Sequence, residues 1–170
     1  MIKQFIFLVL ISLLLFSCKK ETVKPEEPKN PLYEQLVGNY RGTVISTEEL
    51  IDVNGDGVFS NNILSEFGEQ INPSKNRLEI KPNQLTGKEW VFINFPSLDP
   101  QTFTIESFIT SAIILGGEYT IKDNFLILED ENITSIELID INTLEIKGKM
   151  KHLTYEGEKQ ITYTALYERR

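Results

Sequence analysis

The fold of this chain is decided by a stretch near its C-terminus, Leu144-Glu-Ile-Lys-Gly-Lys-Met-Lys-His152, in which apolar and charged residues alternate. Successive side chains of a strand point to opposite faces, so Leu144, Ile146, Met150 and His152 share one face, and the glutamate and lysines share the other. One buried face and one wet face are typical of an antiparallel sheet. The stretch therefore predicts an antiparallel strand packed on a core.

The same period of two continues on both sides of this stretch. Residues 161–167 repeat the alternation, and Glu156-Gly157 supplies turn residues for a hairpin between the two segments. Further strands are predicted at 39–46, 77–80, 89–95, 117–121, 125–128 and 133–139. Short strands joined by tight turns, as at 122–124 and 140–142, predict an all-β antiparallel meander of about eight strands. Such a meander closes into a barrel or forms a curved sandwich.

Two segments depart from this period. Residues 103–115 are apolar and rich in Ser and Thr, and their aromatic spacing fits a short helix as well as a strand. In residues 60–70, Ile63, Leu64 and Phe67 recur at helical spacing. A short helix is therefore predicted there.

The composition is that of a globular protein of 170 residues, 41% hydrophobic and 25% charged. The formal net charge of -8 predicts no nucleic-acid partner, because binding to phosphates needs a basic surface. One Cys and one His exclude a disulfide framework and a zinc site built from several such residues. A Ser/His/Asp triad would have to use His152, which the alternation places on an apolar face as a packed or hydrogen-bonded residue. We therefore expect no enzyme.

The N-terminus carries the features of a secretory signal. Lys3 is followed by an apolar run over residues 5–16, which is shorter than the roughly 20 residues that a spanning helix needs. The run ends at Leu15-Phe-Ser-Cys18, which resembles the lipobox of bacterial lipoproteins. This resemblance implies a signal peptide over residues 1–17 and diacylation of Cys18. An ordinary cleaved signal that leaves a free thiol is the alternative.

The lipobox resemblance also implies a location. The chain is expected in the cell envelope, held to a membrane by acylated Cys18. Lys19 follows the Cys where an Asp would favour the inner membrane, so the outer membrane is the expected site, on either its periplasmic or its surface face. Residues 18–31 form a tether in which three prolines stand among charges, and the folded domain is expected over residues 32–170.

Several short motifs resemble lipocalin-like lipoproteins of Bacteroidota. Leu36-Val-Gly38-Asn-Tyr40 is similar to the L-x-G-x-W opening of these domains, with Tyr40 in the Trp position. Asp52-Val-Asn54-Gly-Asp56-Gly57 resembles an insertion that follows their first strand. Gly117-Glu-Tyr119, Leu144-Glu-Ile146 and residues 163–170 are similar to their later strands. The resemblance implies a small barrel on a lipid anchor, in a family whose members mostly lack a known activity.

The insertion contains a candidate calcium loop. Calcium takes six to eight oxygen ligands, and this loop offers oxygens at alternate positions, from the side chains of Asp52, Asn54, Asp56 and Ser60 and the carbonyl of Val58. The twelfth position is Ile63, which has no carboxylate, so Asn62 or Glu66 would have to complete the shell. The same residues suit a simple turn equally well. Calcium is therefore a candidate cofactor, with weak affinity toward roughly 10⁻⁴ to 10⁻³ M.

Three functional classes stay open: a non-enzymatic module that binds a protein or small molecule, a structural module stabilised by calcium, and a carboxylate-based glycan hydrolase. The hydrolase would need two acids across one cleft. The acidic clusters that could supply them are Glu48-Glu49, Glu129-Asp130-Glu131 and Glu156 with Glu158. Aromatic side chains could line a ligand cavity or fill the barrel. They are Tyr40, Trp90, Phe92, Phe95, Phe103, Phe108, Tyr119, Phe125, Tyr163 and Tyr167. The sequence favours the binding module, because no activated nucleophile is signalled.

Overall fold

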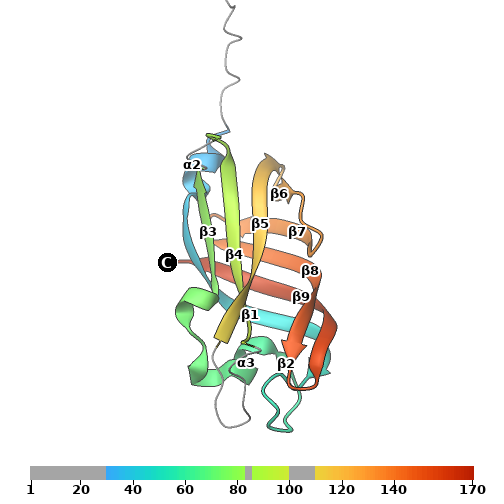
Figure 1. Ribbon diagram of the computed structural model, residues 1–170. Coiled ribbons are helices and arrows are strands. Elements are labelled where there is room, and N and C mark those ends of the chain that lie inside the picture. The colour runs from blue at the N-terminus through green and yellow to red at the C-terminus, as the bar shows by residue number, and fades with distance from the viewer. Residues whose placement is uncertain (1–29, 83–85, 100–109) are drawn as a thin grey trace, which may run out of the picture.

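The computed structural model describes residues 30–82, 86–99 and 110–170 (Figure 1). The predicted signal peptide, Cys18 and all but the last two residues of the predicted tether lie outside these ranges. Residues 103–109 also lie outside them; they belong to the segment 103–115, for which the sequence predicts either a short helix or a strand. Within the described ranges, no helix is long and apolar enough to cross a membrane.

The described chain is built almost entirely from strands (Figure 1). The strands are β1 (Gly38–Ile51), β2 (Ser60–Asn62), β3 (Arg77–Pro82), β4 (Glu89–Leu98), β5 (Thr110–Lys122), β6 (Phe125–Leu128), β7 (Ile133–Asp140), β8 (Thr143–Thr154) and β9 (Gly157–Arg169). The helices are α2 (Leu32–Leu36), α3 (Ile63–Phe67) and the 3₁₀ turns η1 (Gly68–Gln70) and η2 (Pro73–Lys75).

The strands form one closed antiparallel barrel. Hydrogen bonding runs in the order β1-β3-β4-β5-β6-β7-β8-β9, and β9 pairs back onto β1, so eight strands close the barrel. β1 reaches both neighbours because its start pairs with β3 at Gly38–Arg41, while Tyr40–Thr47 pair with β9. β2 adds a short ninth strand on β1. The predicted all-β antiparallel meander is confirmed, in its barrel form.

The core follows the alternation in the sequence. In β8, Leu144, Ile146, Met150 and His152 are all buried, as predicted, whereas the lysines between them are exposed and Glu145 is half-buried. β9 buries every second residue in the same way, with Ile161, Tyr163, Ala165 and Tyr167 inside. These inward side chains fill the barrel together with large rings such as Phe95 and Tyr40.

The helix predicted over 60–70 is shorter than expected. Residues 60–62 pair with β1 as β2, which removes them from the helix. The Asn62 side chain accepts a hydrogen bond from the Leu64 amide at 3.0 Å and so begins α3 at Ile63. Gly68, at φ 51°, ends α3, and residues 68–70 tighten into a 3₁₀ turn. In the ambiguous segment, residues 110–115 are strand, as the first part of β5.

The side chain of Arg169 ties the two ends of the barrel chain to α2. Its guanidinium donates to the Tyr40 hydroxyl at 2.7 Å and to the Gln35 carbonyl, and it lies 5.1 Å from the centre of the Tyr40 ring. The Tyr40 hydroxyl in turn donates to the Leu36 carbonyl at 2.8 Å. Carbonyls at the end of a helix lack hydrogen-bond donors within the helix. Here Arg169 and Tyr40 donate the missing hydrogen bonds. We call Arg169, Tyr40 and these α2 carbonyls the closure clamp.

We expect the close approach of β8 to the loop before β7 to forbid a side chain at Gly148. A Cβ there would lie 2.0 Å from the Asn132 carbonyl oxygen and 2.7 Å from the Tyr163 hydroxyl, whereas a Cβ at Gly117 in β5 would meet nothing within 4 Å. Gly148→Ala should lower the free energy of unfolding by about 1 to 3 kcal/mol, and Gly117→Ala should change it by less than about 1 kcal/mol. Urea unfolding of both variants tests this. Equal effects would contradict the placement of β8.

Candidate functional site

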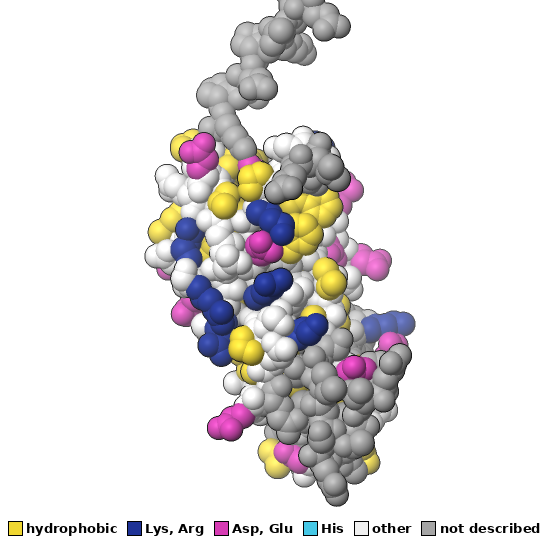
Figure 2. Space-filling view, turned by 60° about the vertical axis from the view of Figure 1, so that its left-hand side comes forward, with side chains coloured by type: hydrophobic (Ala, Val, Ile, Leu, Met, Phe, Trp, Pro, Cys, Tyr) yellow, Lys and Arg dark blue, Asp and Glu magenta, His cyan; other side chains and the backbone are white. Residues whose placement is uncertain are grey.

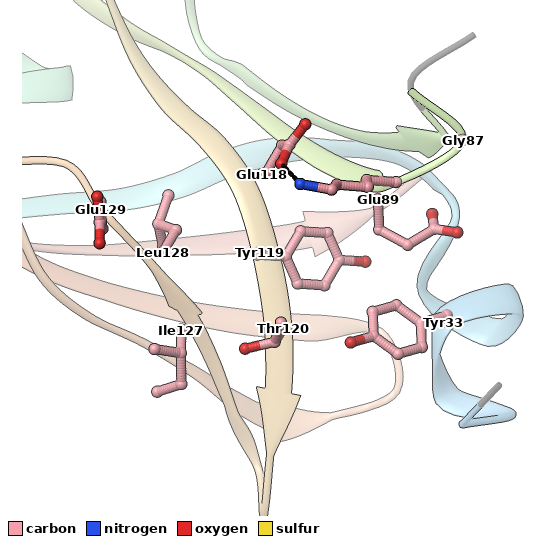
Figure 3. Close-up of a pocket in the computed structure, with 10 residues that line it drawn as sticks. Tyr33, Gly87, Glu89, Glu118, Tyr119, Thr120, Ile127, Leu128 and Glu129 are labelled. Carbon is pink, nitrogen blue, oxygen red and sulfur yellow. Dashed lines mark hydrogen bonds and ion pairs between the residues drawn. The ribbon is translucent and has the colours of Figure 1, made fainter. Parts of the chain in front are cut away.

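A pocket of about 740 Å³ opens at the end of the barrel at which the described chain begins (Figure 3). Its walls come from α2, the start of β4, the second half of β5, and β6. The lining residues are Tyr33, Gly87, Lys88, Glu89, Glu118, Tyr119, Thr120, Ile127, Leu128 and Glu129. A concave site of this size that joins apolar walls to a few polar groups is the usual form of a small-molecule site.

The pocket arises because β5 extends beyond its pairing with β4 at this end of the barrel. β5 pairs with β4 up to Glu118, opposite Trp90, but continues to Lys122 with β6 as its partner. Past Glu118, the β5 edge facing away from β6 is therefore not covered by the β4 ladder. The hydroxyl of Tyr33 in α2 accepts a hydrogen bond from the Ile121 amide of this edge at 3.1 Å. α2 thus replaces the missing strand and leaves a concavity beside it.

The inner wall of the pocket consists of a buried carboxylate and two tyrosine rings. Trp90 pairs with Glu118, so one further step of this register sets Glu89 opposite Tyr119, with both side chains on the inward face. Glu89 and Tyr119 are each only 4% exposed. The Tyr33 and Tyr119 rings lie 5.7 Å apart between centres. Figure 3 shows the Tyr119 hydroxyl directed toward the side where Glu89 and Tyr33 stand.

The Tyr119 hydroxyl is an exception to normal hydrogen bonding. It is buried, and no described residue accepts or donates a hydrogen bond to it. Burial raises the pKa of Tyr119, and the negative charge of nearby Glu89 raises it further. The phenol therefore stays protonated. A buried hydroxyl normally has a hydrogen-bond partner, so the space in front of the Tyr119 hydroxyl is a candidate position for a polar group of a ligand.

The rim of the pocket is charged and its floor is apolar. Lys88 and Glu118 form an ion pair at 2.7 Å, and this pair holds the pKa of the Glu118 carboxyl below its usual value. Thr120 and Ile127 point outward on the neighbouring strands, and Leu128 faces Tyr119 across β5 and β6. The described lining of the pocket thus combines carboxylates, an ammonium group and an apolar surface.

The outer face of β4 beside the pocket carries aromatic rings. Trp90 and Phe92 stack with ring centres 5.3 Å apart, and the Lys81 ammonium lies 4.9 Å from the centre of the Phe92 ring. Figure 2 shows hydrophobic side chains gathered near the upper end of the molecule, with lysine and arginine side chains beside and below them. Trp90 is the chain's single tryptophan and is adjacent in sequence to Glu89, so its fluorescence can report on the pocket.

The candidate calcium loop lies at the opposite end of the barrel, between β1 and β2 (Figure 1). Its side-chain oxygens accept hydrogen bonds from the loop's own amides. The Asp52 carboxylate accepts from Gly55 at 2.6 Å and from Gly57 at 3.0 Å, and the Asp56 carboxylate accepts from Val58 at 2.7 Å. The Asn54 side chain likewise accepts from the Asp56 amide at 3.0 Å. These are the bonds of the turn interpretation.

Of the two completing ligands considered for calcium, the structure brings only Glu66 to the loop. Glu66 accepts from the Val53 amide at 3.0 Å, whereas the Asn62 side chain begins α3. The Ser60 hydroxyl is hydrogen-bonded to the Ser65 hydroxyl at 3.0 Å and accepts from the Asn62 amide at 2.9 Å. In residues 30–82, 86–99 and 110–170, no group of three or more His, Cys, Asp or Glu side chains is placed to hold a metal ion. Calcium binding therefore stays a prediction.

Two of the remaining chemical candidates, His152 and Asp130, make structural contacts in this fold. His152 is fully buried, its Nε2 lies 2.9 Å from the Pro96 carbonyl, and burial lowers the pKa of its imidazole. Asp130 accepts from the Gly116 amide at 2.8 Å and the Asn132 amide at 2.9 Å, which fixes the turn before β7. The other acids proposed for a hydrolase are exposed. They are Glu48, Glu49, Glu129, Glu131, Glu156 and Glu158.

Sequence reasoning missed most of the pocket. Of the aromatic residues proposed as cavity lining, Tyr119 lines it, whereas Tyr40, Phe95, Tyr163 and Tyr167 fill the core. Phe103 and Phe108 lie outside the described residues. One signal was available for Glu89, because it has the same parity as Val91 and Ile93 and so places a charge on the buried face of its strand.

Comparison with known proteins adds no name to this fold: no protein-family model, no curated protein and no solved structure matches the chain. The closed antiparallel barrel of eight strands is consistent with a lipocalin-like fold.

We expect the Glu66 carboxylate to destabilise the loop end of the barrel at neutral pH. Burial raises the pKa of Glu66, and the negative charges of Asp56 and Asp52 add to this rise. A carboxyl with a raised folded-state pKa stabilises the fold at low pH and loses this contribution as pH rises through that pKa. Glu66→Gln keeps an acceptor for the Val53 amide without the charge, so at pH 7 in chelator its thermal midpoint should exceed that of the parent by about 2 to 4 °C.

The control for this variant is Glu69→Gln, which changes an exposed acid one turn later and should leave the midpoint unchanged. Millimolar calcium should raise the midpoint of the parent more than that of Glu66→Gln if the loop holds the ion. A lower midpoint for Glu66→Gln in chelator would contradict the repulsion inferred at this site.

Proposed function

We propose that this chain is a lipid-anchored cell-envelope protein whose barrel binds a small amphipathic molecule without transforming it. The pocket beside α2 carries the proposal. It joins a large concave space to a buried polar wall and an apolar floor, which suits a ligand with a polar head and an apolar body. The described residues that line it include no Ser, Cys or His, so they offer neither a Ser/His nor a Cys/His pair for nucleophilic catalysis.

The proposed anchor would join the barrel at the end that carries the pocket. The described chain begins at Asn30, and Tyr33, three residues later, lines the pocket. A tether running from acylated Cys18 would therefore join the barrel next to the pocket and turn the pocket end toward the membrane. A ligand that leaves or enters the bilayer would then pass close to the pocket. The outer membrane is the proposed location, on the sequence evidence at Lys19.

A calcium-stabilised structural role is the second candidate, and one observation favours it. The pKa of Glu66 responds to the charges of Asp52 and Asp56, so three acids lie close enough to interact at the loop end. A divalent cation would relieve that repulsion. This role is compatible with ligand binding, because the loop and the pocket lie at opposite ends of the barrel (Figure 1).

Cys18→Ala should release the protein from the membrane fraction, because one thioether-linked diacylglycerol supplies the two acyl chains that stable anchoring needs. Fractionation and gel mobility of parent and variant test this. Unchanged membrane association with unchanged mobility would contradict lipidation at Cys18.

Nile red, a neutral apolar dye, tests the pocket in the unlipidated Cys18→Ala chain. Ile127 lines the pocket and is 51% exposed, so Ile127→Ser should preserve the fold while weakening dye binding about threefold or more through lost apolar contact. Ile114 is 74% exposed and lies outside the pocket lining, so Ile114→Ser is the matched control and should leave dye affinity unchanged. Equal affinity for all three proteins would place the dye elsewhere and remove the support for a ligand pocket.

A further inference from the structure

The outer face of the barrel beside the pocket combines exposed cations with apolar side chains. We propose that this face docks on the surface of an anionic phospholipid bilayer. It extends across β1, β3, β4 and β5, and we call it the basic-aromatic face. Its members are the outward side chains Arg41, Arg77, Lys81, Trp90, Phe92 and Ile114. The inference goes beyond the proposed ligand site and rests on the proposed place of the chain in the cell envelope.

The apolar half of this face follows β4 and continues onto β5. Trp90 and Phe92 alternate with the buried residues of β4, and their ring centres lie 5.3 Å apart. Ile114 is 74% exposed and stands opposite Asn94, so it is a diagonal neighbour of Phe92. The residue directly opposite Phe92 is Gly116, which adds no side chain between them. Exposed apolar side chains that are bordered by polar ones are typical of an interaction surface.

The basic half of the face lies on the neighbouring strands β3 and β1. Lys81 is in register with Trp90, and its ammonium lies 4.9 Å from the centre of the Phe92 ring. Arg77 of β3 stands directly opposite Arg41 of β1, and both side chains are exposed. Figure 2 shows lysine and arginine side chains beside and below a cluster of hydrophobic ones. Cations therefore border the apolar half of the face on one side.

The arginine pair favours an anionic partner. Like charges directly opposite each other destabilise a sheet. In the described part of the chain, neither Arg41 nor Arg77 forms an ion pair. The acid in register with Arg41 is Glu168 of β9, whose carboxylate accepts a hydrogen bond from the Thr43 hydroxyl at 3.3 Å. A lipid phosphate between the two guanidiniums would remove their repulsion, because guanidinium and phosphate form strong hydrogen-bonded pairs.

The formal net charge of -8 is compatible with this contact. Two acids near the face are paired, Glu79 with Lys81 at 3.1 Å and Glu118 with Lys88 at 2.7 Å. The acids of the loop between β1 and β2 lie at the opposite end of the barrel (Figure 1). Exposed charges farther from the bilayer than about 8 Å are largely screened at physiological ionic strength. The cations of the face therefore outweigh the distant acids in its attraction to an anionic surface.

The apolar half favours a bilayer over a soluble polyanion. A polyanion would neutralise the arginines but leave Ile114 in water. A bilayer offers phosphates at its surface and apolar chains just below them, so it fits both halves of the face. Trp side chains are enriched at membrane interfaces, because the ring is apolar and carries one polar N–H. Trp90 beside Lys81 matches that environment.

The start of the described chain lies near this face. Asn30 precedes α2, and Figure 1 shows α2 beside the upper ends of β3 and β4. Trp90 of the face is in register with Glu118, which lines the pocket. A chain anchored before residue 30 would therefore hold the face close to a bilayer. The docking would also bring the mouth of the pocket to the bilayer surface.

Vesicle binding of the unlipidated protein tests this inference. The chain to use is the predicted mature one, residues 18–170 with Cys18→Ala, which lacks the apolar run 5–16. Cosedimentation and the emission of Trp90 compare vesicles of phosphatidylcholine alone with vesicles that also contain a quarter of phosphatidylglycerol. The anionic vesicles should bind at least about tenfold more tightly and shift the Trp90 emission to shorter wavelength, and high salt should remove the preference.

Three variants of exposed side chains assign the binding to the face. Arg77→Gln should weaken partition onto anionic vesicles about fivefold, the ratio for one basic residue near an anionic surface, and leave partition onto phosphatidylcholine unchanged. Ile114→Ser should weaken partition onto anionic vesicles about threefold or more through lost apolar contact. Lys149→Gln is the matched control, because Lys149 is an exposed cation on the outer face of β8, and it should leave partition unchanged.

Three results would overturn the inference. Equal partition onto the two kinds of vesicle would remove the role of anionic lipid. Equal losses in Arg77→Gln and Lys149→Gln would remove the role of this face. A Trp90 emission shift with soluble polyphosphate that equals the shift with anionic vesicles would indicate a polyanion as the partner.

These outcomes are separate from those of the proposed function. If Cys18→Ala changes the gel mobility and releases the full chain from membranes, but phosphatidylglycerol gives no preference, the anchor stands and the docking face falls. If Cys18→Ala changes neither mobility nor fractionation, the anchor falls, and the vesicle experiment still decides the face. A phosphatidylglycerol preference that Arg77→Gln weakens and Lys149→Gln keeps supports the face.

Discussion

The arrangement of the pocket end depends on the closure clamp. Arg169, at the end of the last strand, binds Tyr40 in the first strand and the Gln35 carbonyl of α2. Residues 129 positions apart in the chain are thereby held in one hydrogen-bonded unit. The clamp does more than close the barrel. Because it satisfies the final carbonyls of a helix of only five residues, it fixes a segment too short to be stable alone.

The pocket follows from that fixed helix. α2 places Tyr33 beside the part of β5 that lies beyond its pairing with β4. There the Tyr33 hydroxyl accepts a hydrogen bond from the Ile121 amide. The same ring stands 5.7 Å from Tyr119 and completes the wall that contains Glu89. The pocket is thus assembled from the two ends of the folded chain and the uneven edge between β4 and β5. The proposed anchor would join the chain just before this unit, so the proposed ligand access and membrane attachment would share one end of the barrel.

The sequence predicts local structure here better than it predicts the site. The alternation in β8 and β9 is visible because each strand has one wet face, and it places His152 and Met150 in the core correctly. Barrel closure joins β1 to β9 across most of the chain, and no local pattern records that pairing. The role of Tyr33 in the pocket could not be predicted, because the five residues of α2 are too few to show a helical periodicity. The calcium motif was recognised from Asp52 and Asp56, yet these oxygens also accept bonds from their own turn, so the motif alone does not distinguish a metal loop from a turn.

Amide hydrogen exchange in Arg169→Gln tests whether the closure clamp positions the pocket wall through α2. The amides to compare are Ile121, which donates to Tyr33, and Ile146, in the middle of the β8–β9 sheet. If the clamp holds α2 in place, the variant should lose protection at Ile121 while Ile146 keeps the protection of the parent. Unchanged protection at Ile121 would contradict the claim, because α2 would then hold its place without Arg169.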